Sequence, residues 1–244
     1  NNEISGMTLG IFLSNWINKL KKKRYSYRII FIPETIGSIM YINKNLKKLK
    51  NNMDAGFNIT CVGDEKNYSY LPSKYGNTLS DKVILHVLKY SVKKFNKFKW
   101  TDRGGDERQY CSAGVDLPVA TLMRSKYGLY KEYHTSLDKL GTVVTAKGLG
   151  QSFDAYKKII EALENNYKLK FKLRCEPFLS KRNIYPTMYD APNSERMITS
   201  DMLRHILSYA DGNNDLIDIA NLIDCPIWKL YPYVNVLKKN KLIK

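Results

Sequence analysis

The sequence predicts an α/β fold, and three observations support this prediction. In the first 150 residues, segments with helical spacing of apolar residues alternate with short apolar runs typical of strands. Strands that alternate with helices usually form a mainly parallel sheet covered by those helices. The 244 residues are 43% hydrophobic and 12% aromatic, which is enough for a buried core. After about residue 195 the pattern changes to three short helices, so we expect a second, smaller domain.

The elements of the first part follow this alternation in order. Helical spacing of apolar residues occurs at 7–20, 37–52 and 79–92, the last with Ser80 as the expected capping residue. Short apolar runs at 27–33 and 57–63 predict strands, and the first of them is expected to be buried on both faces.

The last third of the chain has a different character. Residues 167–195 contain one expected strand, three prolines and many polar residues, which indicates a connector. Three short amphipathic helices then follow, with the rhythm of a winged helix-turn-helix, and residues 240–244 are expected to begin the wing. We therefore predict an α/β domain with its connector over 1–190 and a winged-helix domain over 196–244.

Composition limits the classes of partner and compartment. The 40 basic and 23 acidic residues give a net charge of +17, which makes nucleic acid or an anionic membrane surface a candidate partner. Most of the excess is lysine in clusters near expected helix ends, and we favour the interpretation that these clusters form a solvated surface.

No apolar run approaches the roughly 20 residues of a membrane span. The opening NNEISG lacks the basic start of a signal peptide. We expect a cytoplasmic protein without a membrane partner, whose four well-separated cysteines are free thiols.

Polar residues that could do chemistry occur in four loops. The loops lie where strands are expected to end, which is where open α/β sheets place their sites. They carry Glu34; Asp64 with Glu65; Asp106 with Glu107; and His134 with Asp138. Each has an ordinary explanation, since a Glu suits a helix N-terminus, an Asp suits a turn, and a single His is often structural. Taken together, carboxylates and an imidazole are ligand types of hydrolytic zinc, and a further Glu could deprotonate metal-bound water.

Several motifs resemble those of a known family. GDERQYCSAGVDLP and YHTSLDKL resemble the SDHxxFxxAGIP and YHTxxDxx motifs of zinc-dependent aminopeptidases, whose phosphorylase/hydrolase-like α/β fold is a three-layer sandwich. FIPETIGS and NNEISG resemble the same family's FxxEEIGLxGS and (D/N)DNxSG segments. The wider set of motifs, together with the winged helix, is similar to a bacterial branch of aminopeptidase-like proteins often linked to polysaccharide-biosynthesis gene clusters.

The resemblance implies roles for particular residues. These are Glu34 as the general base; Asp64, His134 and Asn2 as ligands of one zinc ion; Thr35 and Asp138 as supports of those ligands; and Asp106, Glu107 and Tyr133 as substrate-binding residues. Two departures stand out, because Asn2 occupies the place of an aspartate ligand and Thr35 that of a glutamate ligand. The strand that carries a further histidine ligand in the family also has no counterpart in this sequence. The resemblance therefore implies a weakly binding, incomplete zinc site.

Three functions remain open from the sequence. The first is a zinc-dependent aminopeptidase-like hydrolase of an amide or peptide bond, impaired in this chain, with a peptide or an amino-modified small molecule as substrate. The second is a protein that binds such a ligand without turnover. The third is a nucleic-acid-binding regulator, whose recognition helix would span 227–239. Only Asn235 on that helix is of a type that commonly reads bases, so a protein contact or homo-oligomer through the winged helix is favoured over nucleic acid.

Overall fold

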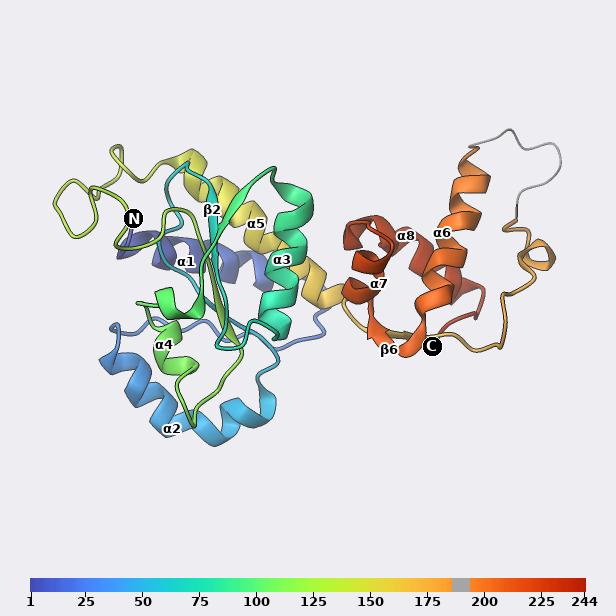
Figure 1. Cartoon of the computed structure of the whole chain (residues 1–244), viewed down its shortest axis with the longest axis horizontal. Helices are drawn as coiled ribbons and strands as arrows, with labels where there is room; N and C mark the ends of the chain where they lie inside the picture. Colours follow the sequence, from blue (N-terminus) through green and yellow to red (C-terminus); the bar gives the residue numbers. More distant parts are fainter. Residues whose placement is uncertain (186–193) are drawn as a thin grey trace. The chain divides into compact units, whose positions relative to one another are not determined.

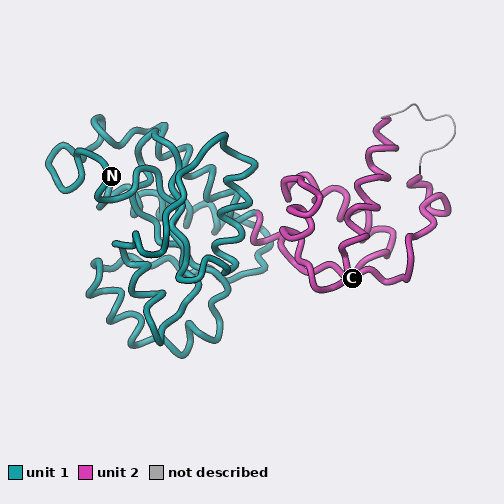
Figure 2. The backbone as a smooth tube through the Cα atoms, viewed as in Figure 1, with its two compact units in different colours: residues 1–161 teal, residues 162–244 magenta. Residues whose placement is uncertain are grey.

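The computed structural model describes residues 1–185 and 194–244, and its contacts divide the chain into two compact units (Figure 2). The first unit comprises residues 1–161 and the second residues 162–244. The second unit thus includes a segment that the sequence analysis assigned to the first domain and its connector. This segment contains strand β5 (Lys168–Lys170), which pairs with β6 (Asp211–Asp215) in the same unit.

A four-stranded mixed sheet forms the centre of the first unit. The strands are β1 (Gly56–Asn58), β2 (Tyr68–Leu71), β3 (Phe95–Lys97) and β4 (Val119–Met123), in the order β1-β4-β2-β3. The pairs β1–β4 and β2–β3 are parallel, whereas β2–β4 is antiparallel. All residues of β2 and β4 are buried, as expected for strands at the centre of a covered sheet. The predicted α/β class is confirmed, with one antiparallel pairing in the sheet.

The helices of the first unit flank this sheet in Figure 1. They are α1 (Ile4–Asn18), α2 (Ile36–Asn52), α3 (Leu79–Ser91), the short α4 (Glu107–Tyr110) and α5 (Ala146–Asn165), with a 3-10 turn at Trp100–Asp102. The three helices expected from apolar spacing are confirmed as α1, α2 and α3. The capping residue of α3 is Thr78 and not Ser80, because Thr78 and Asp81 form a reciprocal capping box. The Ser80 hydroxyl instead donates to the Pro118 carbonyl at 2.6 Å.

The strand expected at 27–33 is not formed. Among the described residues this segment has no strand partner, and Phe31 is 50% exposed. The segment runs beside α1, where the absence of a side chain at Gly10 leaves room for Phe31. An apolar run predicts an extended backbone, but the sheet also requires a neighbouring strand, which the run itself does not reveal. The expected strand at 57–63 is likewise shorter, since β1 ends at Asn58.

Close packing of α1 depends on a small residue. A Cβ atom built on Gly6 would lie 2.0 Å from the Ile59 carbonyl oxygen, a distance that no side chain tolerates. Gly6 therefore allows the start of α1 to lie directly against the chain that follows β1. This contact brings the N-terminal residues of the chain to the loop that contains Asp64.

The second unit has the architecture of a winged helix. It contains α6 (Glu195–Tyr209), α7 (Leu216–Leu222), α8 (Ile227–Lys239) and a 3-10 turn at Leu179–Arg182, and β5 and β6 pair antiparallel beside a bridge between Phe171 and Ile243. Its core is formed by fully buried aliphatic side chains, including Leu203, Ile206, Ile219, Ile227, Leu230 and Leu237. The three predicted helices are confirmed.

Two further findings concern the whole described chain. No described helix is both long and apolar enough to span a membrane. The four cysteines are free thiols, as predicted, and Cys175 alone of the four is exposed.

Candidate functional site

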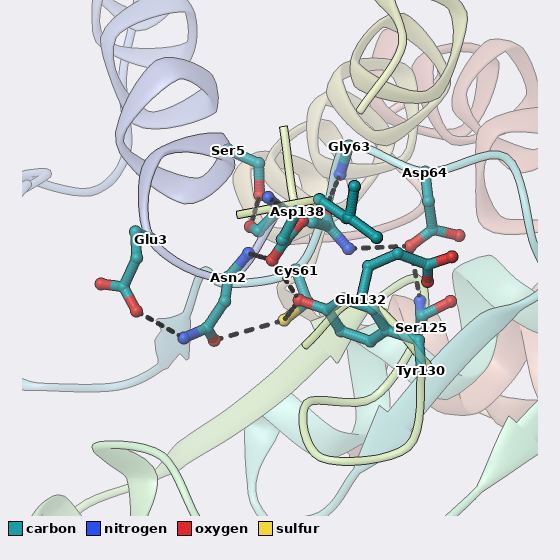
Figure 3. Close-up of polar contacts among 12 residues, drawn as sticks. Asn2, Glu3, Ser5, Cys61, Gly63, Asp64, Ser125, Tyr130, Glu132 and Asp138 are labelled. Carbon is teal, nitrogen blue, oxygen red and sulfur yellow. Dashed lines mark hydrogen bonds and ion pairs between the residues drawn. The ribbon is translucent and has the colours of Figure 1, made fainter. Parts of the chain in front are cut away.

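The polar residues at the start of α1 meet the loops after β1 and β4 (Figure 3). Asp64 is at the centre of this meeting point and is only 3% exposed. Its Oδ1 accepts the backbone N–H of Lys66 at 2.8 Å. Its Oδ2 accepts two further bonds, from the Ser125 backbone N–H at 2.9 Å and from Asn1 Nδ2 at 3.0 Å. The Asp64 carboxylate is thus held by three N–H donors, which we call the Asp64 network.

Asn1 ties the Asp64 network to helix α1. Its side-chain oxygen accepts the Gly63 backbone N–H at 2.8 Å while its amide nitrogen donates to Asp64. The Asn1 carbonyl accepts the Ser5 hydroxyl, and the Ser5 oxygen in turn accepts the Val62 backbone N–H at 3.1 Å. Both polar ends of the buried Asn1 amide are therefore used within the protein.

Asp138 lies next to this network and is held in a similar way. Its Oδ1 accepts a hydrogen bond donated by the backbone nitrogen of Asn1 at 2.6 Å, and its Oδ2 accepts bonds from the Asn2 N–H at 3.2 Å and the Tyr130 hydroxyl at 2.7 Å. Burial tends to raise the pKa of Asp138, but these hydrogen bonds outweigh it and hold the pKa below its usual value. Asp138 is therefore a carboxylate that anchors the start of the chain.

Cys61 is the sulfur group of this region. Its thiol is fully buried, donates to Asn2 Oδ1 at 3.5 Å and lies 4.0 Å from the Tyr130 hydroxyl. Burial raises the pKa of the Cys61 thiol to about 11. It is a neutral thiol packed with Leu71 and Met123, as a small core residue.

Glu34 is located in a second group, the Glu34 cluster, which also contains Thr35, Asp106, Arg108 and Tyr133. The Thr35 backbone N–H donates to Asp106 Oδ1 at 2.8 Å, and Arg108 donates to the Thr35 hydroxyl at 2.8 Å. Thr35 has a φ of 63°, which is rare for a β-branched residue and is fixed by these two contacts. Partial burial of the Glu34 carboxylate, followed by the nearby charge of Asp106, raises the pKa of Glu34. No described residue donates a hydrogen bond to this carboxylate.

Glu107 follows Asp106 in sequence, but its carboxylate is enclosed by hydrogen-bond donors. We call these donors and Glu107 the Glu107 network. The residue is fully buried. Its Oε1 accepts the backbone N–H groups of Gly104 and Gly105 at 3.0 and 2.9 Å and the Tyr127 hydroxyl at 2.7 Å. Its Oε2 accepts Asn58 Nδ2 at 2.7 Å. This carboxylate closes the loop before α4 onto the end of β1 and is shielded from solvent.

His134 is exposed, with a positive φ of 56°. Its ring stacks on Tyr133 with centroids 3.9 Å apart, and Tyr133 makes an edge contact with Tyr130. Burial, followed by the nearby charge of Glu34, raises the pKa of Tyr133, a member of the Glu34 cluster. Within the described part of the chain, His134 has no hydrogen-bond partner.

The structure brings most of the predicted site residues together, in two sets. Asn2 meets Asp138, and Glu34 lies with Thr35, Asp106 and Tyr133. Asp64 and Glu107 are each enclosed by hydrogen-bond donors. Among the contributing residues that were not assigned a role in the site from the sequence are Asn1, Cys61, Arg108 and Tyr130. The doubled asparagine of NNEISG was a signal for Asn1, whereas nothing local marked Tyr130.

Comparisons with known proteins agree with this architecture. A domain of unknown function, DUF4910, matches residues 1–166, and a winged helix-turn-helix matches residues 167–244. The chain belongs to the DUF4910 family. This family assignment covers the first unit and both sets of polar residues.

Two relatives of this DUF4910 chain come from Clostridium acetobutylicum. One, named "Putative polysaccharide biosynthesis protein with aminopeptidase-like domain", is 39% identical over 221 residues, which are 90% of this chain and 50% of that protein. The other is a crystal structure described as a "putative peptidase", with a TM-score of 0.87 and 34% identity over 100% of this chain and 54% of the other. The chain therefore spans about half the length of these relatives.

A more distant structure shows the fold alone. The aminopeptidase from Aneurinibacillus sp. strain AM-1 matches with a TM-score of 0.50 and 12% identity, over 67% of this chain and 39% of the other. The aminopeptidase-like fold with a C-terminal winged helix, predicted from the motifs, is confirmed.

The zinc implied by this fold can be compared with the residues present. Among residues 1–185 and 194–244, no group of three or more His, Cys, Asp and Glu side chains is arranged to hold a metal ion. Asp64 Oδ2 already accepts two N–H bonds, which uses both of its lone pairs. Zinc sites need at least three protein ligands. The described residues of this DUF4910 chain therefore do not fit a zinc site.

Proposed function

We propose that the first unit binds a ligand with a primary amine next to an amide bond, such as an aminoacyl amide or an amino-sugar amide. We further propose that the 244-residue chain hydrolyses such amides slowly or not at all. The observation that carries the proposal is the Glu34 cluster, where a carboxylate that accepts no hydrogen bond from residues 1–185 and 194–244 lies beside a second acid.

Electrostatics favour an ammonium group at this position. The Glu34 and Asp106 charges repel each other, and a cation between them would relieve that repulsion. Arg108 offsets part of the negative charge but donates to Thr35, so it is engaged in positioning the loop. The Tyr133 ring supplies an adjacent aromatic surface, which suits a cation or the apolar part of an amino acid.

The same cluster contains one element of a hydrolytic mechanism. A Glu with a raised pKa is suited to accept a proton from water, as a general base does. Polarising the amide carbonyl requires a second group, which zinc supplies in the aminopeptidases that this chain resembles. Since the described residues do not form that metal site, the proposal for this chain is binding. The naming of a relative for polysaccharide biosynthesis supports amino-sugar amides as one ligand class.

Calorimetric titration with leucinamide tests the amine site. The matched probe is N-acetyl-leucinamide, in which the amine is blocked and carries no charge. We expect leucinamide to bind and the acetylated form not to bind, and we expect Glu34→Gln to weaken leucinamide about tenfold because a charged contact is lost. The control Asp54→Asn alters an exposed acid outside the site and should leave binding unchanged. Equal binding of the two probes would contradict the proposal.

A separate proposal concerns the winged helix, which we expect to contact protein and not to read DNA. Residues 1–161 have 27 basic and 14 acidic residues, whereas residues 162–244 have 13 and 9, so the winged-helix unit carries little of the excess charge. Nucleic-acid affinity depends strongly on such charge. Light scattering of the chain, with and without residues 162–244, measures whether this unit mediates a homo-oligomer. Tight, salt-dependent binding of duplex DNA by the winged-helix unit would contradict it.

A further inference from the structure

A pocket outside the Glu34 cluster has a distinct chemistry. It is lined by residues after Asp64, by residues of β2 and around β3, and by the loop from Ser125 to Tyr130. Its volume is about 480 Å³, which is within the roughly 300–1,000 Å³ typical of small-molecule sites. We call it the Lys66–Lys126 pocket, after the two lysines that line it.

The pocket is positively charged. In the described chain neither lysine has a carboxylate partner. The Lys126 ammonium donates to the Tyr127 carbonyl at 3.4 Å and lies 4.3 Å from the centre of the Tyr127 ring and 5.6 Å from that of Phe98. Glu65 is the acid of the lining; it forms an ion pair with Lys147 at 2.7 Å and accepts a hydrogen bond from the Thr145 hydroxyl at 2.9 Å. Two ammonium groups are thus available to an anion.

A buried guanidinium, that of Arg124, precedes the loop that lines the pocket. Arg124 directly precedes two lining residues and is 4% exposed. It stacks on Tyr68 at 4.2 Å and donates to the neutral Gln151 side chain at 3.0 Å, while its Nε has no partner within the described residues. Buried charges are usually paired with an opposite charge. No described carboxylate forms an ion pair with Arg124, whose partners Tyr68 and Gln151 lie outside the lining of the pocket.

The neutral part of the lining suits hydroxyl groups. The side chains of Asn67, Ser69, Asn96 and Ser125 can each donate and accept hydrogen bonds, which is also true of a sugar hydroxyl. Asn96 already donates to the Ser69 hydroxyl at 3.3 Å, which orients both groups. A peptide backbone has separate donors and acceptors and would match this lining less well.

Aromatic surfaces complete the pocket. Phe98 and Tyr130 line it, and the Tyr130 hydroxyl also donates to Asp138. The pocket thus shares a residue with the contacts at the start of α1. Aromatic walls with a few convergent polar groups are typical of ligand sites.

We propose that the Lys66–Lys126 pocket binds a sugar that carries a carboxylate, such as a uronic acid. The lysines would hold the carboxylate, the Asn and Ser side chains the hydroxyls, and Phe98 and Tyr130 the ring. The proposal goes beyond amine binding at Glu34 and does not depend on it.

Titration of the full chain with glucuronic acid, glucose and glucose 6-phosphate tests the proposal. We expect glucuronic acid to bind more tightly than either of the others. Lys66→Gln and Lys126→Gln should each weaken it roughly tenfold, because each removes a charged hydrogen-bond donor. Phe98→Leu should also weaken it, since the ring face is lost while apolar volume is kept. The control Lys139→Gln changes an exposed lysine outside the pocket and should have no effect.

The outcomes separate the possibilities. Equal binding of glucose and glucuronic acid would overturn the role of charge, and tighter binding of glucose 6-phosphate would overturn the choice of carboxylate. No effect of either lysine substitution, with unchanged thermal unfolding, would place the ligand elsewhere and overturn the assignment of the pocket. Leucinamide binding in the same variants should be unaffected, which distinguishes this site from the Glu34 cluster.

Discussion

Two adjacent acids, Asp106 and Glu107, belong to regions with opposite properties. In the Glu107 network the carboxylate is fully buried and accepts hydrogen bonds from backbone, amide and hydroxyl donors. In the Glu34 cluster, Asp106 holds a loop through Thr35, and the neighbouring Glu34 carboxylate accepts no hydrogen bond from the described residues. The comparison shows that the number of donors around a carboxylate, and not its place in a motif, separates an acid that supports the fold from one available to a ligand.

The largest expected loss of stability follows from a substitution in the Glu107 network. Glu107→Gln replaces one acceptor oxygen with an NH₂ group that faces N–H or O–H donors. We expect it to lower the free energy of unfolding by about 3–5 kcal/mol, as for a broken buried charge interaction. Chemical denaturation measures this change, with the exposed Asp54→Asn as the control. A loss comparable to that of the control would show that the network is not structural.

A smaller loss of unfolding free energy is expected for a substitution in the Asp64 network. Asp64→Asn keeps one acceptor oxygen, so part of the contact with Lys66 or Ser125 survives, but the amide nitrogen meets an N–H donor. We expect a loss of roughly 1–3 kcal/mol. The same denaturation assay checks it. An unchanged or increased free energy of unfolding would mean that the Asp64 carboxylate does not stabilise the fold and is available for another role.

Almost no stability change is expected at Glu34. Glu34→Gln removes a charge that no described donor stabilises and that Asp106 repels. We expect a change within about 0.5 kcal/mol, as for most exposed substitutions. Its effect should instead appear in leucinamide binding. A large loss of stability would show that Glu34 supports the fold as Glu107 does, and would contradict the distinction between the two acids.

The pH dependence of binding gives the subtlest test. Because the pKa of Glu34 is raised, the folded chain retains a proton there at a pH where the unfolded chain has lost it. Ionising Glu34 therefore costs stability as pH rises through this window, whereas amine binding, which needs the carboxylate, strengthens. Leucinamide affinity should fall as the pH is lowered and Glu34 takes up its proton, and this fall should begin at a higher pH than for an ordinary Glu carboxyl. In Glu34→Gln this fall should be smaller.

Local signals explain which features could be predicted from the sequence. The helices and the winged helix follow from apolar spacing within single segments, and Glu34 and Asp106 stand out as acids after expected elements. The prediction of a strand at 27–33 was wrong because strand formation depends on a partner elsewhere in the chain. Glu107 looked like a substrate ligand by motif, and its enclosure depends on Asn58 and Tyr127, which are distant in sequence. Such long-range contacts leave no local pattern.

Zinc titration of the 244-residue chain tests most directly the claim that the Asp64 and Glu107 carboxylates are occupied by contacts of the fold. The measurement is calorimetric zinc affinity together with hydrolysis of a panel of aminoacyl amides. We expect weak zinc binding and little or no turnover, since a site short of ligands loses at least roughly 10–100-fold in metal affinity or activity. Stoichiometric, tight zinc binding with steady turnover that is lost in Glu34→Gln would contradict the account.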